Sequence, residues 1–332
     1  MRLFRTITTS LGATLLLGGV LATPAAAGPG RHQIVDLGTL GGAYSFASAV
    51  NDRGDVTGQS ADANGSLKAF RWHGGRMTDL GVLDPSVPYA FGADINNRGW
   101  VVGTSDVAGG TATHAFLWRD GVLTDLGTLG GATSSASAVN DRGQVVGRSQ
   151  TAAGQWHAFL WQDGTMTDLG LDTATGINQV GQITGASPFG DFYRAYRWRN
   201  GAVTDLGDLG SGFSDAAAIN AQGHVTGTSS LVHYGVSRAY LYRTSMVDLG
   251  TLGGLSAYVV ALNDRDEVLG ASETAGGSVD AFLWRDGRMV DLTAAGVVPA
   301  FAQARDLNNR GQIAGSYYPD TTTWQPHAAL FS

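Results

Sequence analysis

Short apolar runs alternate with polar, glycine-containing turns along most of the chain. Residues 136–169 show the pattern clearly, with four runs rich in alanine, β-branched or aromatic residues: Ala136–Asn140, Gln144–Ser149, His157–Trp161 and Thr165–Leu169. Asp141-Arg142-Gly143 and Gln162-Asp163-Gly164 lie between runs and are typical of tight hairpin turns. No run has the 3.6-residue apolar period of a helix. The pattern therefore predicts four short antiparallel strands.

The same pattern recurs seven times. Each copy opens with Asp-Leu, at Asp36, Asp79, Asp125, Asp168, Asp205, Asp248 and Asp291. A repeat of about 43 residues with four strands is typical of a propeller blade. We therefore expect an all-β fold, a seven-bladed β-propeller of four-stranded blades in one domain, residues 28–332. Residues present in every copy are expected to build the blades rather than to carry chemistry.

The two ends of the chain are out of phase with the repeat. The seventh copy stops after its third predicted strand, His327–Phe331. The missing fourth strand stands near the other end, at Gln33–Leu37, and resembles the fourth strand at Arg288–Leu292. We expect this N-terminal strand to complete the last blade and close the ring, because pairing would leave no open sheet edge.

Side-chain size predicts the radial order of the strands. The first strands hold small residues, such as Ala136-Ser137-Ala138-Val139, which suit the crowded centre of a ring. The third strands hold aromatic pairs, such as Phe159 and Trp161, which we expect to wedge between neighbouring blades. A ladder of ligand-stacking aromatics is the alternative interpretation of these pairs.

Several polar and glycine positions recur in all copies. The asparagine that ends each first strand is expected to form a turn, and its positions are Asn51, Asn96, Asn140, Asn178, Asn220, Asn263 and Asn308. Gly147 and its counterparts are expected to allow close strand packing. Asp36 and its counterparts are expected to cap backbone amides of the following glycine-rich bend.

A calcium site and a zinc site are the alternatives to these structural roles. Asn51, Asp52 and Asp55 supply oxygen atoms, but Arg53 stands where a calcium ion would sit. His114, His157 and His327 occupy one repeat position, so symmetry predicts a ring rather than a zinc cluster. We therefore expect no metal and no cofactor. No nucleophile, zinc-protease or phosphate-loop motif is present in the sequence.

The N-terminal segment predicts export. Arg2 and Arg5 precede an apolar run at 11–22 and an Ala25-Ala26-Ala27 cleavage pattern, so residues 1–27 read as a signal peptide. We expect a secreted protein, extracellular or at the cell surface, with no membrane insertion after cleavage. The chain has no cysteine, which excludes disulfides. Its net charge is −7 and Lys68 is its one lysine, which disfavours nucleic acid as a partner.

The repeated strings resemble a known family. DLGTLGG at Asp36–Gly42, Asp125–Gly131 and Asp248–Gly254, together with HAFLW at His114–Trp118 and His157–Trp161, is similar to the HAF repeat family of bacterial extracellular repeat proteins. The similarity covers the whole expected mature chain. It implies secretion and a propeller-like repeat, and it carries no catalytic residues to transfer.

Loop length predicts where a ligand would bind. The connections after the second and fourth strands are the longer ones and must emerge on one face, which we name the loop face; the short, similar turns form the opposite turn face. Aromatic residues on the loop face suit sugar or protein recognition. The candidate binding residues are Tyr44, Tyr89, Phe91, Trp156, Phe192, Tyr193, Tyr234, Tyr317, Tyr318 and Trp324.

Three functions remain open on sequence alone. The first is a secreted recognition module for an unknown glycan or protein, without catalysis. The second is a structural component of the cell surface or matrix. The third is a secreted lyase or hydrolase, which would need an acid and a base outside the repeat pattern that converge on the mouth of the central channel.

Overall fold

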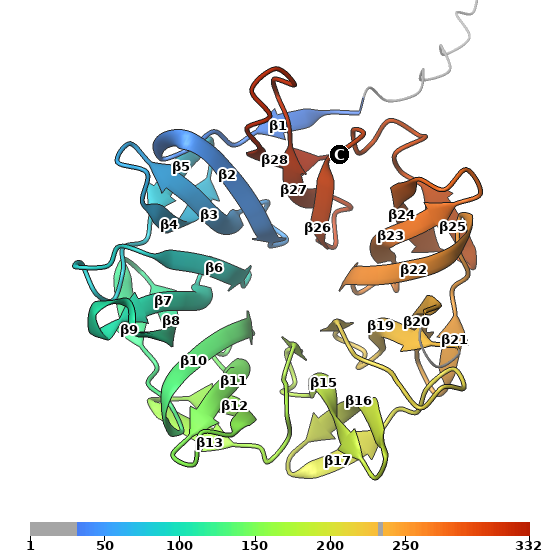
Figure 1. Ribbon diagram of the computed structural model, residues 1–332, viewed down its shortest axis with the longest axis horizontal. Coiled ribbons are helices and arrows are strands. Elements are labelled where there is room, and N and C mark those ends of the chain that lie inside the picture. Colours follow the sequence, from blue (N-terminus) through green and yellow to red (C-terminus); the bar gives the residue numbers. More distant parts are fainter. Residues whose placement is uncertain (1–31, 232–234) are drawn as a thin grey trace, which may run out of the picture. The chain divides into compact units, whose positions relative to one another are not determined.

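The computed structural model describes residues 32–231 and 235–332. His32–Ser332 forms one compact unit, in which seven four-stranded antiparallel sheets stand around a central axis. Figure 1 views this ring along the axis, with the first strand of each sheet innermost. The seven-bladed propeller predicted from the repeat is confirmed. The signal-peptide prediction for residues 1–27 lies outside the described residues.

The first three blades follow the sequence directly. Blade 1 consists of β2 (Gly41–Val50), β3 (Val56–Asp62), β4 (Leu67–His73) and β5 (Arg76–Asp79). Blade 2 consists of β6 (Ala90–Ile95), β7 (Val101–Val107), β8 (Ala112–Arg119) and β9 (Val122–Asp125), with the short 3₁₀ helix η1 (Ala108–Gly110) after β7. Blade 3 consists of β10 (Gly130–Val139), β11 (Val145–Thr151), β12 (Trp156–Gln162) and β13 (Thr165–Asp168).

The next three blades have the same order but less uniform inner strands. Blade 4 consists of β14 (Gly176–Ile177), β15 (Ile183–Phe189), β16 (Phe192–Arg199) and β17 (Ala202–Asp205). Blade 5 consists of β18 (Ala218–Ile219), β19 (Val225–Ser230), β20 (Ser237–Tyr242) and β21 (Met246–Asp248). Blade 6 consists of β22 (Gly253–Leu262), β23 (Val268–Thr274), β24 (Val279–Arg285) and β25 (Arg288–Asp291).

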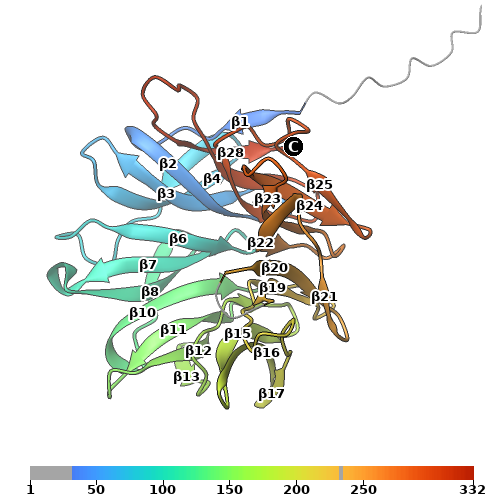
Figure 2. The ribbon, with the colours of Figure 1, turned by 45° about the vertical axis from the view of Figure 1, so that its right-hand side comes forward.

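Blade 7 joins the two ends of the chain. It consists of β26 (Gln303–Leu307), β27 (Ile313–Tyr317), β28 (His327–Phe331) and β1 (Ile34–Asp36). β1 pairs antiparallel with β28, so that Ile34 faces Phe331, and the backbone amide of Leu37 donates to the Ala328 carbonyl at 2.9 Å. Figures 1 and 2 both show β1 beside β28. The predicted closure by the N-terminal strand is confirmed.

The inner strands of blades 1, 3 and 6 begin earlier than predicted. β10 starts at Gly130, six residues before the predicted run at Ala136. The additional residues pair with the end of β11, where Gly130 faces Thr151. Gly131 is required here because a Cβ would come within 2.6 Å of the Thr151 carbonyl oxygen. The glycines that looked like a bend in the sequence therefore allow a close strand approach.

Seven hydrophobic clusters fill the junctions between blades. The junction of blades 2 and 3, for example, packs Phe159 of β12 against Val102, Ala115 and Leu117 of blade 2. Each of the seven clusters contains one fully buried third-strand aromatic residue: Phe70, Phe116, Phe159, Tyr196, Tyr240, Phe282 or Phe331. The predicted wedge role of these aromatics is confirmed. Their burial is a main source of stability.

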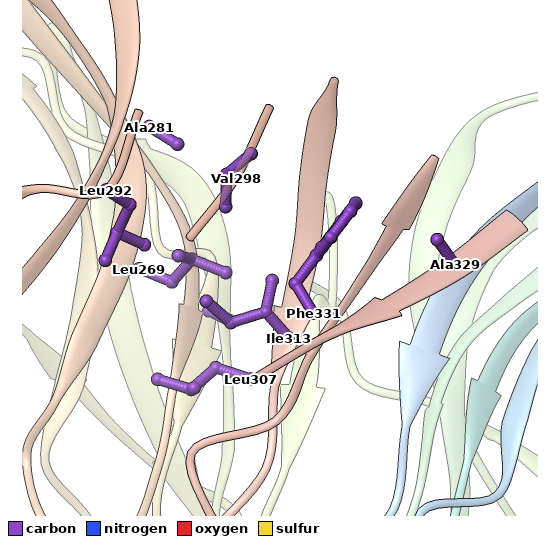
Figure 3. Packing of buried hydrophobic residues seen from close by; sticks show 9 residues of the cluster. Leu269, Ala281, Leu292, Val298, Leu307, Ile313, Ala329 and Phe331 are labelled. Carbon is purple, nitrogen blue, oxygen red and sulfur yellow. The ribbon is translucent and has the colours of Figure 1, made fainter. Parts of the chain in front are cut away.

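The seventh junction uses a different residue position for the same purpose. Ala329 stands where Phe159 stands in blade 3, and Phe331 takes the position of Trp161. Figure 3 shows Phe331 beside Ile313 and near Leu307, on the side of Leu269 and Val298 from the preceding blade. The fully buried Phe331 thus fills the junction that Ala329 leaves empty.

Candidate functional site

A β-bulge brings extra side chains into the central channel. The pairing register of the inner strand shifts by one residue just before the repeated asparagine, for example between Gly92 and Asp94 of β6 and between Ala304 and Asp306 of β26. Such a bulge opposes two residues to one, so consecutive side chains can share a direction. In β26, Arg305 and Asp306 consequently both line the channel.

Three repeat positions of the inner strand can therefore face the channel. Counted back from the asparagine, the fifth residue is Phe46, Phe91, Ser135, Thr173, Asp215, Tyr258 or Gln303. The third residue is Ser48, Ala93, Ser137, Thr175, Ala217, Val260 or Arg305. The second residue is Ala49, Asp94, Ala138, Gly176, Ala218, Ala261 or Asp306. The charged and aromatic members of these sets lie mainly in blades 7, 1 and 2, which are neighbours in the ring.

A cavity of about 450 Å³ lies where these three blades meet at the loop-face end of the channel. Phe46 of β2 and Phe91 of β6 supply its aromatic walls, and Gln59, Gln303 and Arg305 supply its polar groups. We name this cavity the channel-mouth site. Its volume is in the range of small-ligand pockets, and apolar walls with few polar groups are typical of them.

Two carboxyl groups lie deeper in the channel. Asp94 and Asp306 line a second cavity of about 250 Å³, which shares Ser48 and Arg305 with the channel-mouth site. Asp306 Oδ2 accepts from the Val50 amide at 2.7 Å, and Asp94 Oδ2 accepts from the Val139 amide at 2.8 Å. Each carboxyl group thereby links its own blade to the next one.

The channel environment makes both carboxyl groups weaker acids. Burial raises the pKa of Asp94 to about 6, against the opposing hydrogen bond from Val139. Burial raises the pKa of Asp306 to about 7, and the nearby Asp94 carboxyl adds to this shift. Low-dielectric surroundings disfavour the charged form of an acid, and a second negative charge does so further. Both groups therefore change charge near neutral pH.

The turn-face end of the channel is built in a different way. Asn140 closes its own turn by accepting at Oδ1 from the amides of Arg142 and Gln144, both at 3.1 Å. Its Nδ2 donates across the blade junction to the Asn178 carbonyl at 3.1 Å. The same inter-blade bond recurs between all seven asparagines, at 2.8–3.3 Å, and closes from Asn308 to Asn51. The predicted turn role is confirmed, and the closed asparagine circuit is an addition to it.

A second ring of contacts surrounds a cavity of about 230 Å³ at this end. The backbone amide after six of the seven asparagines donates to a side chain of the next blade, for example the Asp52 amide to Asn97 Oδ1 at 2.8 Å and the Asn97 amide to Asp141 Oδ1 at 2.9 Å. Ala221 has no side-chain acceptor, so the ring of contacts has a gap at that residue.

The carboxyl group of Asp55, one of the residues of the calcium hypothesis, is buried and pairs with Arg71 at 2.8 Å.

The three repeated histidines make pairs rather than a cluster. His114, His157 and His327 each place Nδ1 2.8–2.9 Å from an oxygen of the Asp-Leu aspartate on the neighbouring strand of the same blade. Arg194 makes the equivalent pair with Asp205 at 3.2 Å. Those aspartates also accept from the amide two residues on, as in Gly127 to Asp125 at 2.8 Å, which confirms the predicted capping.

Residues 32–231 and 235–332 contain no group of three His, Asp or Glu side chains placed to hold a metal ion. Within the same residues, no helix has the length and apolar composition of a membrane span.

The candidate aromatic residues fall into separate groups on the loop face. Tyr44 packs edge-on to Phe46 at a ring-centroid distance of 5.8 Å, next to the channel-mouth site that Phe91 lines. Trp324 packs edge-on to Tyr318 and to Phe301, at 5.4 Å and 5.9 Å. These two groups belong to different blades.

The remaining candidates make local contacts. Tyr193 stacks on Phe213, and the guanidinium of Arg194 lies 4.4 Å from the Phe192 ring centroid. The guanidinium of Arg148 similarly lies 4.7 Å from the Trp156 ring centroid.

The last three candidates differ in availability: one has its hydroxyl engaged, one is partly exposed and one is not described. The Tyr317 hydroxyl donates to Asp36 at 3.3 Å, which supports ring closure. Tyr89 is partly exposed, and its backbone carbonyl accepts from the Ser105 hydroxyl at 2.9 Å, a contact that leaves the side chain free. Tyr234 lies outside the described residues.

The channel-mouth site was largely missed by reasoning from the sequence. Phe91 was among the candidates, but Phe46, Gln59, Gln303 and Arg305 were not. The signal was present, because these inner-strand positions break a repeat that elsewhere holds small residues. The bulge hid it, since regular alternation would not place Arg305 and Asp306 on one side.

Comparison with known proteins supports the fold and leaves the function open. No protein-family model and no curated protein matches this sequence. The chain is similar in structure to the β-propeller domain of the Trilobed protease from Pyrococcus furiosus, which has an open velcro topology: the TM-score is 0.56 at 10% identity, over 87% of this chain and 96% of that one.

Two further solved structures show the same likeness. YCF48 bound to D1 peptide aligns with a TM-score of 0.50 at 14% identity, over 92% of this chain and 97% of that one. A puromycin-hydrolyzing peptidase from Mycobacterium tuberculosis aligns with a TM-score of 0.52 at 13% identity, over 82% of this chain and 48% of that one. The chain thus spans about half the length of that peptidase. At these identities the likeness establishes the propeller fold alone.

Proposed function

We propose that this chain is a secreted recognition module that binds a glycan or a protein through its loop face. One observation carries the proposal. The exposed aromatic side chains of the described residues all lie in the loop-face connections, at the loop-face ends of third strands or on channel-facing positions, and they are Phe46, Trp156, Phe192, Phe213, Tyr258, Phe301 and Trp324. Exposed aromatics on one face of a soluble protein mark interaction surfaces.

The turn face supports the same assignment by contrast. Its repeated asparagines are buried and their side-chain amides are committed to the circuit that joins the blades. Groups that hold the ring together cannot also rearrange around a ligand without a cost in stability. Seven near-identical turns would in addition offer seven equal weak sites rather than one specific site.

The export signal and the repeat strings complete the proposal. Residues 1–27 have the pattern of a signal peptide, and DLGTLGG with HAFLW is similar to the HAF repeat family. We therefore propose membership of that family and an extracellular or cell-surface location. The negative charge disfavours nucleic acid as the partner. The peptide bound in YCF48 shows that one propeller of this fold accepts a peptide ligand.

A secreted hydrolase or lyase is the second candidate, favoured by one observation. Asp94 and Asp306 are acids outside the repeat pattern, both line the channel, and both have a raised pKa. Perturbed acids in a cleft are typical of catalytic sites, although structural acids share this property. Product release during the binding assay below, lost in Asp94→Asn and Asp306→Asn, would favour this candidate.

The test is a binding screen of the secreted protein against glycan, cell-wall and peptide arrays. Replacing Trp156, Phe192 and Trp324 together by alanine should weaken binding at least about tenfold, because exposed aromatic anchors dominate such interfaces. The control replaces Val122 and Val180, exposed apolar residues of the turn face, by alanine and should bind as wild type. A wild-type protein that binds nothing on the arrays would refute the proposal, and a loss confined to the control would move the site to the turn face.

A further inference from the structure

The channel-mouth site differs from the rest of the channel wall in the chemistry of its side chains. Blades 3, 4 and 5 present Ser137, Thr175 and Ala217 at the position that Arg305 occupies in blade 7. The same blades present Ser135, Thr173 and Asp215 where Phe46 and Phe91 stand in blades 1 and 2. The ring is therefore symmetric in its backbone and one-sided in its channel chemistry.

Most hydrogen-bond donors of the Arg305 guanidinium are available to a ligand at this site. Its side chain is exposed to the channel, and its Nη2 donates to Gln303 Oε1 at 2.5 Å. Within the described part of the chain it makes no ion pair, and it is the one basic residue among those lining the three channel cavities. A guanidinium presents its donors in a planar fork that matches a carboxylate.

The other groups around the cavity suit a sugar ring. Phe46 and Phe91 offer apolar faces on which the C–H groups of a pyranose can pack. Gln59 uses its amide nitrogen on the Ala90 carbonyl at 3.0 Å, and Gln303 uses its amide oxygen on Arg305. The Gln59 oxygen and the Gln303 nitrogen thus remain to accept from and donate to ligand hydroxyls.

We propose that the channel-mouth site binds an acidic sugar, with the uronate carboxylate on Arg305 and the sugar ring between Phe46 and Phe91. This inference rests on the proposed recognition function and specifies its site and ligand class.

A peptide carboxyl terminus is the competing source of a carboxylate, and the site fits it less well. Peptide termini are usually held by a nest of free backbone amides. Here the cavity is lined by the extended strands β2, β6 and β26, in which successive backbone amides point alternately toward the partner strand and away from it, so they do not form such a nest. The converging donors of the site are the side chains of Arg305 and Gln303.

The deeper carboxyl groups predict the sign of a pH effect on binding. Asp94 and Asp306 share a cavity with Arg305, and Asp52 and Asp141 act on them from the turn-face end. Above neutral pH their negative charges would oppose a bound uronate, and below pH 6 protonation would remove that opposition. Affinity for a uronate should therefore fall as pH rises from 5.5 to 8. An amine ligand would show the opposite trend.

The experiment measures binding of oligogalacturonate and of a glucuronate-containing oligosaccharide by calorimetry at pH 5.5 and 8, with the carboxyl-reduced oligogalacturonate as matched neutral ligand. We expect wild type to bind the uronates more tightly at pH 5.5, and Arg305→Gln to weaken uronate binding at least tenfold while leaving the weaker binding of the neutral ligand unchanged. Arg288→Gln, an exposed arginine of β25, should bind as wild type. Circular dichroism melting controls for folding.

The outcomes separate this inference from the function on which it rests. Wild type that binds neither uronate, or Arg305→Gln that binds them as well as wild type, would overturn the acidic-sugar site. If array ligands are still bound in that case, the recognition function stands. A peptide with a free carboxyl terminus that binds through Arg305 more tightly than the uronates would also overturn the sugar class.

Discussion

The two ends of the central channel are built from the same seven strands and follow opposite rules. At the turn-face end one residue type, asparagine, occupies all seven copies and forms a closed circuit of hydrogen bonds. At the loop-face end, five residues before each asparagine, the copies hold six different residue types. The backbone tolerates this variety because these positions lie outside the junction clusters, and side chains such as Phe46 and Gln303 face the channel.

The contrast shows how a repeat protein can acquire a site. Positions that touch the next blade are under the same packing constraint in every copy, so one residue solves the problem seven times. Channel-facing positions outside those contacts, such as Phe46 and Arg305, are free of this constraint, and a change in one copy leaves the others intact. Arg305, Phe46 and Phe91 can therefore differ from their counterparts without loss of the fold.

Opening the ring is the strongest way to break this comparison. The asparagine circuit crosses the closure at Asn308 and Asn51, and β1 holds that closure by pairing with β28. Deleting residues 28–37 should abolish cooperative unfolding or give oligomers, because β28 would become an unpaired edge and Leu37 would leave its cluster. Chemical denaturation and light scattering report the result.

A deletion of residues 28–31 alone is the matched control, since it retains β1 and should unfold as the undeleted protein does. A cooperative, monomeric protein without residues 28–37 would show that the circuit and the junction clusters close the ring without the strand.

The fold was predictable from the sequence because the repeat occurs seven times in the chain. Each copy gave an independent reading of strand length and turn type, and the shifted phase of Gln33–Leu37 identified the closure. The early start of β10 was not predictable by pattern alone, since Gly130-Gly131 reads as a bend until the close approach to β11 is known. Glycine marks both situations.

For the candidate site, the sequence predicted which face of the propeller it would occupy but not which residues would come together. The loop face followed from connection lengths, and exposed aromatics do gather there. The division of those aromatics into local groups depends on three-dimensional distances that the sequence does not contain. The inward turn of Arg305 and Asp306 depends on the bulge, which is visible as a register shift and not as a residue pattern.

Two single substitutions, one near each end of the inner strand of blade 3, sharpen the comparison. Asn140→Ala removes four hydrogen bonds, leaves the Asn178 carbonyl without its donor, and should cost about 1–3 kcal/mol of unfolding free energy. Ser135→Phe, in the same strand, should change stability by less than about 0.5 kcal/mol, because Phe46 and Phe91 already stand at that position in other blades.

Urea denaturation of the two variants beside wild type makes this measurement. Equal losses in both variants would mean that the channel-facing position is as constrained as the asparagine, and the argument that the loop-face end is free to vary would fail.

An effect that depends on pH is expected between the two ends, at Asp306. Its pKa of about 7 in the folded chain lies above the ordinary value of 3.8, so between these pH values the folded state holds a proton that the unfolded state has released. Stability should fall as pH rises through this window. Asp306→Asn removes the buried charge, and its Oδ1 can still accept from the Val50 amide.

The variant should therefore gain stability over wild type as pH rises, on the order of 1 kcal/mol at pH 8, and little at pH 4.5. This gain is well below the full linkage energy of such a shift, because the carboxyl group keeps partial access to water in the channel. Asp120→Asn is the control: Asn200 already occupies the same turn position in blade 4, so its effect should be small at both pH values. A stability difference between Asp306→Asn and wild type that does not change with pH would show that the pKa of Asp306 is not raised. The electrostatic argument that the channel discriminates between anionic and cationic ligands would then fail as well.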